Sequence, residues 1–116
     1  MAQPRHIKTF VSPGAVAGRT LVTFGAADGE VVTATAATDT LIGVAERIGS
    51  RDNNRVDVVV GGIADAVAGG NITRGDILTT NASGKAITAT AGDRVIGIAM
   101  VSAVADDHID VLIAQG

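Results

Sequence analysis

The sequence has 116 residues, a formal net charge of −3 and no cysteine. The lack of cysteine excludes disulfides, thiolate catalysis and cysteine-ligated metals, and the mild charge argues against a nucleic-acid partner. The length corresponds to one domain, with a hydrophobic fraction of 47% that small aliphatic side chains and two phenylalanines supply.

A core of such small side chains favours many closely packed strands over a few helices. Burial of further surface in an oligomer is one way to stabilise it. The longest apolar run, residues 95–105, is far shorter than the roughly 20 residues of a membrane-spanning helix. The basic residues near the N-terminus are not followed by an apolar run, so we expect neither a signal peptide nor a membrane partner.

The first 13 residues are predicted to form an extended arm. Pro4 and Pro13, the two prolines of the chain, bracket this segment, and each favours extended geometry in the residue before it. Ile7 and Phe10 lie between them without helical spacing. We therefore expect an arm at residues 1–13 whose last part can form an edge strand.

The charged residues are distributed unevenly along the chain. Three basic residues precede the first acidic residue, Asp28, and residues 102–116 contain three aspartates but no lysine or arginine. The basic residues are Arg5, Lys8 and Arg19. One interpretation is that both ends of the chain are simply solvated. The other is that the basic arm pairs with an acidic surface of a partner or a neighbouring subunit.

The next segment is predicted to be a β-hairpin. A β-branched and aromatic run at residues 20–24 has the composition of a strand. Asp28-Gly29 is a strong hairpin turn because both residues tolerate φ > 0, and residues 31–35 then form the partner strand. The second half repeats this unit with a strand at 76–80, a turn at 81–84 and a strand at 85–90.

A short apolar run with a central glycine follows each hairpin. The run at 41–45 is too short for a helix, and Gly43 predicts a bulge or the close approach of another backbone. Gly97 takes the same place in the second half. Each run leads through a polar loop, at 49–55 and at 104–108, into a last strand, at 56–60 and at 109–113.

The segment between the halves, residues 61–70, is not decided by its pattern. Its apolar residues fit one short helix. The flanking pairs Gly61-Gly62 and Gly69-Gly70 suit a strand equally well. A turn at 71–76 then leads into the second half.

The two halves repeat three blocks in the same order. Residues 39–45 return as 93–99, a shift of 54 (93 − 39). Residues 33–36 return as 88–91 with a shift of 55, and 56–60 return as 109–113 with a shift of 53. Because the length changes fall between the blocks, where loops tolerate them, the pattern indicates an internal duplication.

We therefore predict an all-β fold, a compact barrel or sandwich of about eight to ten short strands. The duplicated domain spans residues 14–116, with halves at approximately 14–60 and 68–116. Neither half has enough apolar bulk to close a core alone. We therefore expect the halves to pack as a pseudo-twofold pair.

The sequence offers little to support catalysis. None of its serines lies in a nucleophile elbow, no phosphate-binding glycine loop is present, and His6 lies in the arm. We predict that the protein is not an enzyme and binds no cofactor. The alternative that stays open is a divalent metal at His108, which lies beside three aspartates, Asp106, Asp107 and Asp110.

The order of the repeated motifs resembles a known family. Val16–Leu21 and Ile72–Leu78 both open with an apolar residue, followed by a glycine, two further residues and a leucine. Each opening precedes a glycine-bearing hairpin, an Ile-Gly-Val/Ile-Ala run and a final strand. Over roughly residues 5–114, this order resembles the capsid decoration, or cement, proteins of tailed phages.

The resemblance implies a structural protein of the virion, made in the host cytoplasm and bound to the outer surface of the expanded capsid. Such proteins bridge neighbouring subunits of the major capsid protein. They often do so as trimers, so a homotrimer is favoured here and a dimer stays possible. The family has no catalytic residues to transfer to this chain.

By analogy with decoration proteins, we expect the arm to be the capsid-binding element. Its extended backbone can add to a subunit of the shell, with basic side chains meeting acidic groups and apolar side chains as anchors. The residues expected to bind are Pro4, Arg5, His6, Ile7, Lys8, Phe10 and Val11.

An alternative function is a β module of the virion that binds a host surface or a carbohydrate. Sugar faces usually stack on tryptophan or tyrosine, and the chain contains neither. This composition favours the cement protein.

Overall fold

The computed structural model describes residues 5–50 and 55–113, and these residues form nine strands and no helix. The predicted all-β fold is therefore confirmed. No helix in these two ranges is long and apolar enough to cross a membrane. The strands are β1 (Arg5–Val11), β2 (Leu21–Phe24), β3 (Val31–Thr33), β4 (Leu41–Ala45), β5 (Arg55–Val67), β6 (Ile77–Thr80), β7 (Ala86–Thr88), β8 (Gly97–Ala99) and β9 (His108–Ile113).

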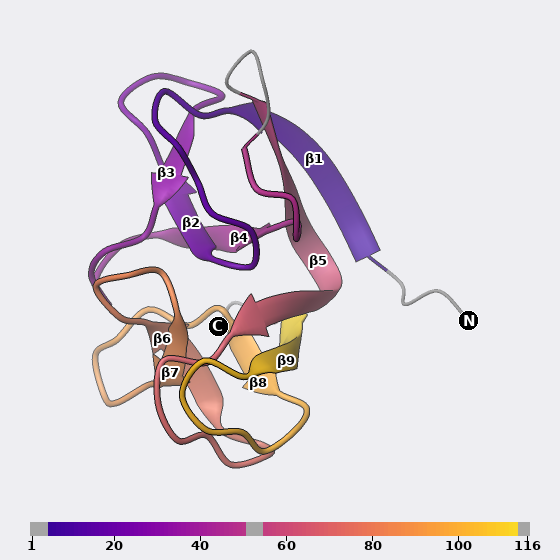
Figure 1. The fold of residues 1–116 in the computed structure, drawn as a ribbon. Helices are drawn as coiled ribbons and strands as arrows, with labels where there is room; N and C mark the ends of the chain where they lie inside the picture. The colour runs from indigo at the N-terminus through magenta and orange to yellow at the C-terminus, as the bar shows by residue number, and fades with distance from the viewer. Residues whose placement is uncertain (1–4, 51–54, 114–116) are drawn as a thin grey trace.

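Strand β5 runs through both halves of the molecule (Figure 1). The strands follow the order β3-β2-β4-β5-β9-β8-β6-β7, and β1 pairs with β5 outside this path. Val58 and Val59 of β5 pair with β4, whereas Ile63–Val67 pair with β9. We call β1–β4 with residues 55–60 the N-lobe, and residues 63–67 with β6–β9 the C-lobe.

The predicted duplication is visible in the backbone hydrogen bonds, because equivalent bonds recur in the two lobes. The amide of Ala34 donates to the carbonyl of Leu21, and the amide of Ala89 to that of Ile77. Three further amide-to-carbonyl bonds of the N-lobe also have counterparts in the C-lobe. In the N-lobe they run from Arg19 to Ala45, from Ala45 to Thr20 and from Glu46 to Asp57. In the C-lobe they run from Gly75 to Ala99, from Ala99 to Asp76 and from Met100 to Asp110. The two lobes are therefore copies of one fold.

The described part of the expected arm is a strand of the N-lobe. β1 pairs antiparallel with β5, with Phe10 opposite Val56. In the C-lobe, Ile63–Val67 pair with β9 in the same way, with Ala66 opposite Ile109. The undecided segment between the halves is thus a strand, and it is the C-lobe's equivalent of β1.

The two central glycines mark close approaches of neighbouring backbones, as the sequence predicted. A Cβ atom on Gly43 would overlap the carbonyl oxygen of Val59, and one on Gly97 would overlap that of Leu112. The register between β2 and β4 also shifts beside Gly43, between Val22 and Thr23. Only a residue without a side chain fits at these two positions.

One face of the N-lobe sheet packs into the interior of the C-lobe. Leu21 pairs across the sheet with Val44, and Val44 pairs with Val59. We call these three residues the N-row, and each is at most 1% exposed. They belong to one buried cluster with Leu78, Ile96, Ile109 and Val111 of the C-lobe. The other face of the N-lobe sheet lines a separate core of Val16, Val22, Val31, Ala45, Val56 and Val58.

The equivalent row of the C-lobe is exposed, which makes the expected pseudo-twofold packing wrong. Ile77 pairs with Ile98, and Ile98 pairs with Leu112. We call these three residues the C-row, and they are 52%, 36% and 41% exposed. A twofold axis would bury the same face of both lobes. The lobes instead pack head to tail, with the outer face of one against the interior of the other.

Candidate functional site

Strand β1 lies at an edge of the sheet. It pairs with β5 from Arg5, opposite Gly62, to Val11, opposite Arg55. Among the described residues, its only other β-pairing is a single bridge between Val11 and Glu30. The second edge of β1 therefore presents backbone donors and acceptors, a surface to which another chain can add a strand.

The outer face of β1 combines two aliphatic side chains with a polar pair. Ile7 and Val11 are about half exposed. Between them, the hydroxyl of Thr9 donates a hydrogen bond of 2.6 Å to Oδ1 of Asp57 on β5. This pair ties the centre of the strand to its neighbour, so the two aliphatic side chains are held at fixed positions on the surface.

The other face of β1 carries a cation above an aromatic ring. Nζ of Lys8 lies 5.6 Å from the ring centroid of Phe10, and an exposed contact of this kind contributes about 0.5–1 kcal/mol. The ring itself is half-buried against the N-lobe core. The positive charge of Lys8 is thus held along the strand in solvent.

The structure places four of the seven residues expected to bind on the two faces of one strand. Ile7 and Val11 share the outer face, and Lys8 and Phe10 share the other. His6 is exposed opposite Gly61, and the backbone of Arg5 pairs with Gly62. Pro4 lies outside the described residues. That these residues bind a capsid stays a prediction.

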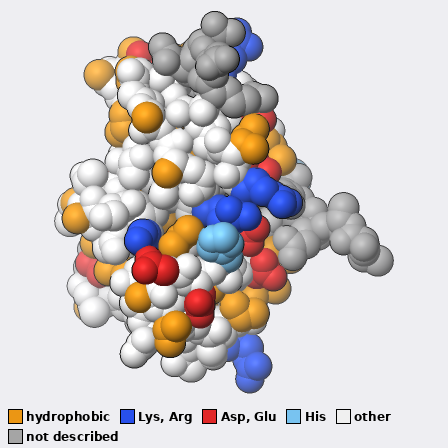
Figure 2. All heavy atoms as spheres, in the orientation of Figure 1, with side chains coloured by type: hydrophobic (Ala, Val, Ile, Leu, Met, Phe, Trp, Pro, Cys, Tyr) orange, Lys and Arg blue, Asp and Glu red, His pale blue; other side chains and the backbone are white. Residues whose placement is uncertain are grey.

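The third basic residue of the opening segment is paired within the chain. Nε of Arg19 lies 3.6 Å from Oδ2 of Asp65 on β5, so this ion pair links the N-lobe with the C-lobe. Figure 2 shows basic and acidic side chains next to one another on the face in view, where hydrophobic side chains also reach the surface. On this face the charge is therefore mixed.

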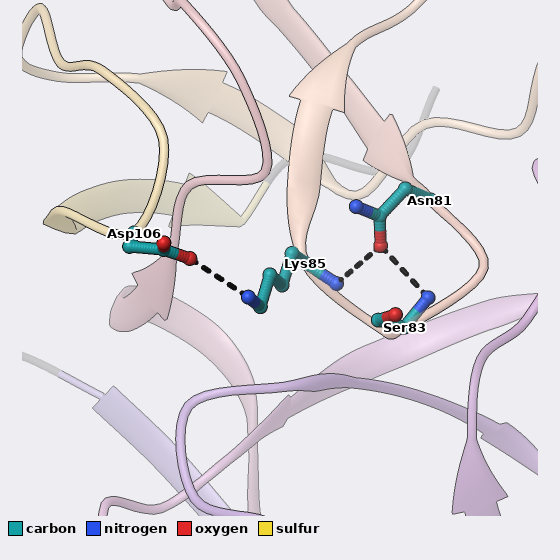
Figure 3. A network of polar contacts seen from close by, with 4 residues as sticks. All are labelled: Asn81, Ser83, Lys85 and Asp106. Carbon is teal, nitrogen blue, oxygen red and sulfur yellow. Dashed lines mark hydrogen bonds and ion pairs between the residues drawn. The ribbon is translucent and has the colours of Figure 1, made fainter.

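The acidic segment before β9 is held by a lysine of the C-lobe hairpin (Figure 3). Nζ of Lys85 donates to Oδ1 of Asp106 at 2.7 Å, and the hydrogen bond and charge of Lys85 lower the pKa of Asp106. Oδ1 of Asn81 accepts from the amides of Ser83 and Lys85 at 2.9 and 3.0 Å, which fixes the turn that carries the lysine.

The proposed metal at His108 finds little support in this geometry. His108 begins β9 opposite Val67, and Asp106 is engaged by Lys85. Within residues 5–50 and 55–113, no group of three or more histidine, aspartate or glutamate side chains is placed to hold a metal ion.

The C-row is a second candidate surface, and sequence reasoning missed it. The glycine-to-leucine spacing of the two openings would match Leu21 with Leu78, whereas the predicted strands at 20–24 and 76–80 match Leu21 with Ile77. The pairing of β2 with β4 and of β6 with β8 agrees with the match to Ile77. The sequence did not indicate which face of these strands the other lobe covers, so the exposed row was not predicted.

Comparison with known proteins adds a family and a fold. The sequence model of a family described as phage cement protein matches residues 2–115. Among solved structures, the N base of the head fiber gp8.5 in bacteriophage phi29 is similar. Its TM-score is 0.74 at 22% sequence identity, over 96% of this chain and 95% of that chain. At this identity the likeness shows a shared fold. The search of curated proteins gave no match.

Proposed function

The chain belongs to the phage cement protein family, and from this premise we propose that it binds the outer surface of the expanded capsid and bridges neighbouring subunits of the major capsid protein. Membership implies a structural role, a place in the virion and association with the capsid. The bridging contact, the outer location and a homotrimeric state are our proposals.

The observation that carries this proposal is the exposed edge of β1. An edge strand with an open row of backbone groups and two half-exposed aliphatic side chains, Ile7 and Val11, has the features of β-strand addition. Main-chain hydrogen bonds then supply affinity, and the alternating side chains supply specificity. Lys8 adds a positive charge next to this edge for an acidic group on the shell.

Bridging follows if several copies of β1 act together. A single edge strand binds weakly, but an oligomer raises the effective concentration of its remaining strands after the first one has bound. Avidity can then exceed the affinity of one strand by about 10²–10⁴-fold. A cement protein of this kind holds neighbouring subunits together without any one strong contact.

The proposal is tested with expanded, undecorated heads and an Ile7→Asp variant in a co-sedimentation assay. A charge at a buried interface anchor should weaken capsid binding at least about tenfold. A point variant is preferable to removal of the segment, because β1 covers Val56 and Val58 of the N-lobe core.

The matched control is Ile48→Asp, since Ile48 is also an exposed isoleucine but lies between β4 and β5, outside β1. This control should bind like the wild type. Light scattering should show the wild-type oligomer for both variants. Co-sedimentation of Ile7→Asp at the wild-type level would show that β1 is not the capsid-binding element.

A further inference from the structure

We propose that the C-row docks onto the end of the N-lobe of a second copy of this chain, in the same way that the N-row docks onto the C-lobe within one chain. The contact is apolar and head to tail. This inference names the interface of the proposed oligomer, and so it rests on that part of the proposed function.

The receiving surface within the chain lies at one end of the C-lobe. The amide of Leu21 in the N-row donates a hydrogen bond of 2.8 Å to the carbonyl of Gly84, in the turn between β6 and β7. Ala66 belongs to the same buried cluster as the N-row, and Thr80 is 1% exposed. We call Ala66, Thr80 and Gly84 the C-tip surface.

The equivalent surface of the N-lobe has no other lobe packed against it. The pairing of the strands matches Ala66 with Phe10, and Thr80 with Phe24. Gly29 takes the place of Gly84 in the turn, with φ values of 80° and 76°. We call Phe10, Phe24 and Gly29 the N-tip surface.

The N-tip surface and the C-row are not covered by another lobe, whereas their equivalents, the C-tip surface and the N-row, pack against each other. Phe24 is 57% exposed, and the position of a Cβ atom on Gly29 has no heavy atom within 4 Å. The same position on Gly84 meets Thr20 and Thr33 of the N-lobe. Within each chain the N-row therefore contacts the C-tip surface. The two equivalent surfaces, the C-row and the N-tip surface, lie at opposite ends of the chain without such a contact.

A backbone group supports the same reading. The N-row amide of Leu21 is satisfied across the lobe contact by Gly84. The equivalent amide of the C-row, that of Ile77, makes no such bond to a turn or loop carbonyl in residues 5–50 or 55–113. In the proposed contact this amide donates to the carbonyl of Gly29 in the second copy, whose other lone pair accepts from Val11.

The chemistry of the two surfaces fits a second copy. The C-row offers three adjacent aliphatic side chains on neighbouring strands. The N-tip surface holds both phenylalanines of the chain, and aromatic side chains are enriched at the energetic centres of interfaces. Because each copy carries both halves, the contact is heterologous and closes into a ring when the rotation between copies permits it.

The test uses two variants, Ile98→Asp in the C-row and Phe24→Asp in the N-tip surface, measured by size-exclusion chromatography with light scattering. Wild-type protein should be an oligomer, and each variant alone should be a monomer. An equimolar mixture should form a 1:1 heterodimer, because each variant supplies the half that the other lacks. Ile48→Asp, the exposed control outside both surfaces, should stay oligomeric.

Three results would overturn the inference. They are a monomeric wild type, variants that keep the wild-type oligomer, and a mixture of two folded variants that stays monomeric. Circular dichroism and thermal melting establish that the variants are folded, and Leu112→Lys replaces Ile98→Asp if the latter unfolds. Capsid co-sedimentation of the wild type is scored separately, so that a failed interface and a failed cement function can be distinguished.

Discussion

The N-lobe and the C-lobe share a strand order and a set of backbone hydrogen bonds, yet the N-lobe buries both faces of its sheet and the C-lobe leaves one face exposed. Val44 of the N-row is fully buried between the lobes, whereas Ile98, at the same place in the copy, is 36% exposed. The residues at equivalent places of the two lobe ends differ as well. The C-lobe has Ala66 where the N-lobe has the half-buried Phe10.

This difference shows how a duplicated fold acquires two distinct ends. A small residue at Ala66 leaves room for the N-row inside the C-lobe, and the pair of lobes becomes one body. The remaining row and the remaining tip keep apolar side chains that no other lobe covers within the described chain, and Ile77 and Phe24 are more than half exposed. An exposed apolar patch of this kind marks an interaction site in a folded protein.

The largest expected effect on the free energy of unfolding is the difference between two aspartate substitutions, one at the same place in each row. Val44→Asp buries an unpaired charge and should lower the free energy of unfolding by about 4 kcal/mol, whereas Ile98→Asp should change it by about 0.5 kcal/mol. Urea denaturation measures both, in the Phe24→Asp background, so that contact with a second copy does not enter. Equal losses at the two positions would contradict the head-to-tail packing.

A second prediction concerns a feature that the lobes share. Gly43→Ala and Gly97→Ala each place a methyl group against a backbone carbonyl, which should lower the free energy of unfolding by about 1–3 kcal/mol in either lobe. Gly70→Ala is the control, because a Cβ atom there has no heavy atom within 4 Å. If only one of the two central glycines proved sensitive, the lobes would not be equivalent at this strand.

The smallest effect concerns an ion pair of the C-lobe. Lys85 lowers the pKa of Asp106 below 3.8, so this pair stabilises the fold above about pH 4, and the contribution is lost as the pH falls through the lower pKa of the folded state. In an NMR titration, Lys85→Met should raise the pKa of Asp106, while Arg94→Met should leave it unchanged. An unaltered pKa in Lys85→Met would show that the contact is absent in solution.

Much of the strand pattern could be predicted because turn residues and β-branched runs are local signals. The strand at 41–45 and the hairpin turn at Gly29 lie where the sequence placed them. Residues 61–70 were ambiguous because alanines fit a helix or a strand equally well. Pairing with β9 decides for a strand, and that contact is distant in the sequence.

The candidate surfaces were harder to predict than the strands. Alternation indicates that a strand has two faces, but Leu21 and Ile77 occupy the same place in their lobes and differ only in what packs against them. That neighbour is the other lobe, which no local pattern encodes. The described part of the arm is extended, as predicted. Its pairing with β5 could not be predicted, because the sequence alone does not show that Val56 and Val58 belong to the core beside which β1 lies.

Cryo-electron microscopy of expanded, undecorated heads after addition of the purified protein would show directly whether it acts as a cement. We expect added density on the outer surface of the shell, in contact with at least two neighbouring major capsid subunits, with β1 at the contact. Heads that gain no density, or density that touches a single subunit, would contradict the proposed role as a cement.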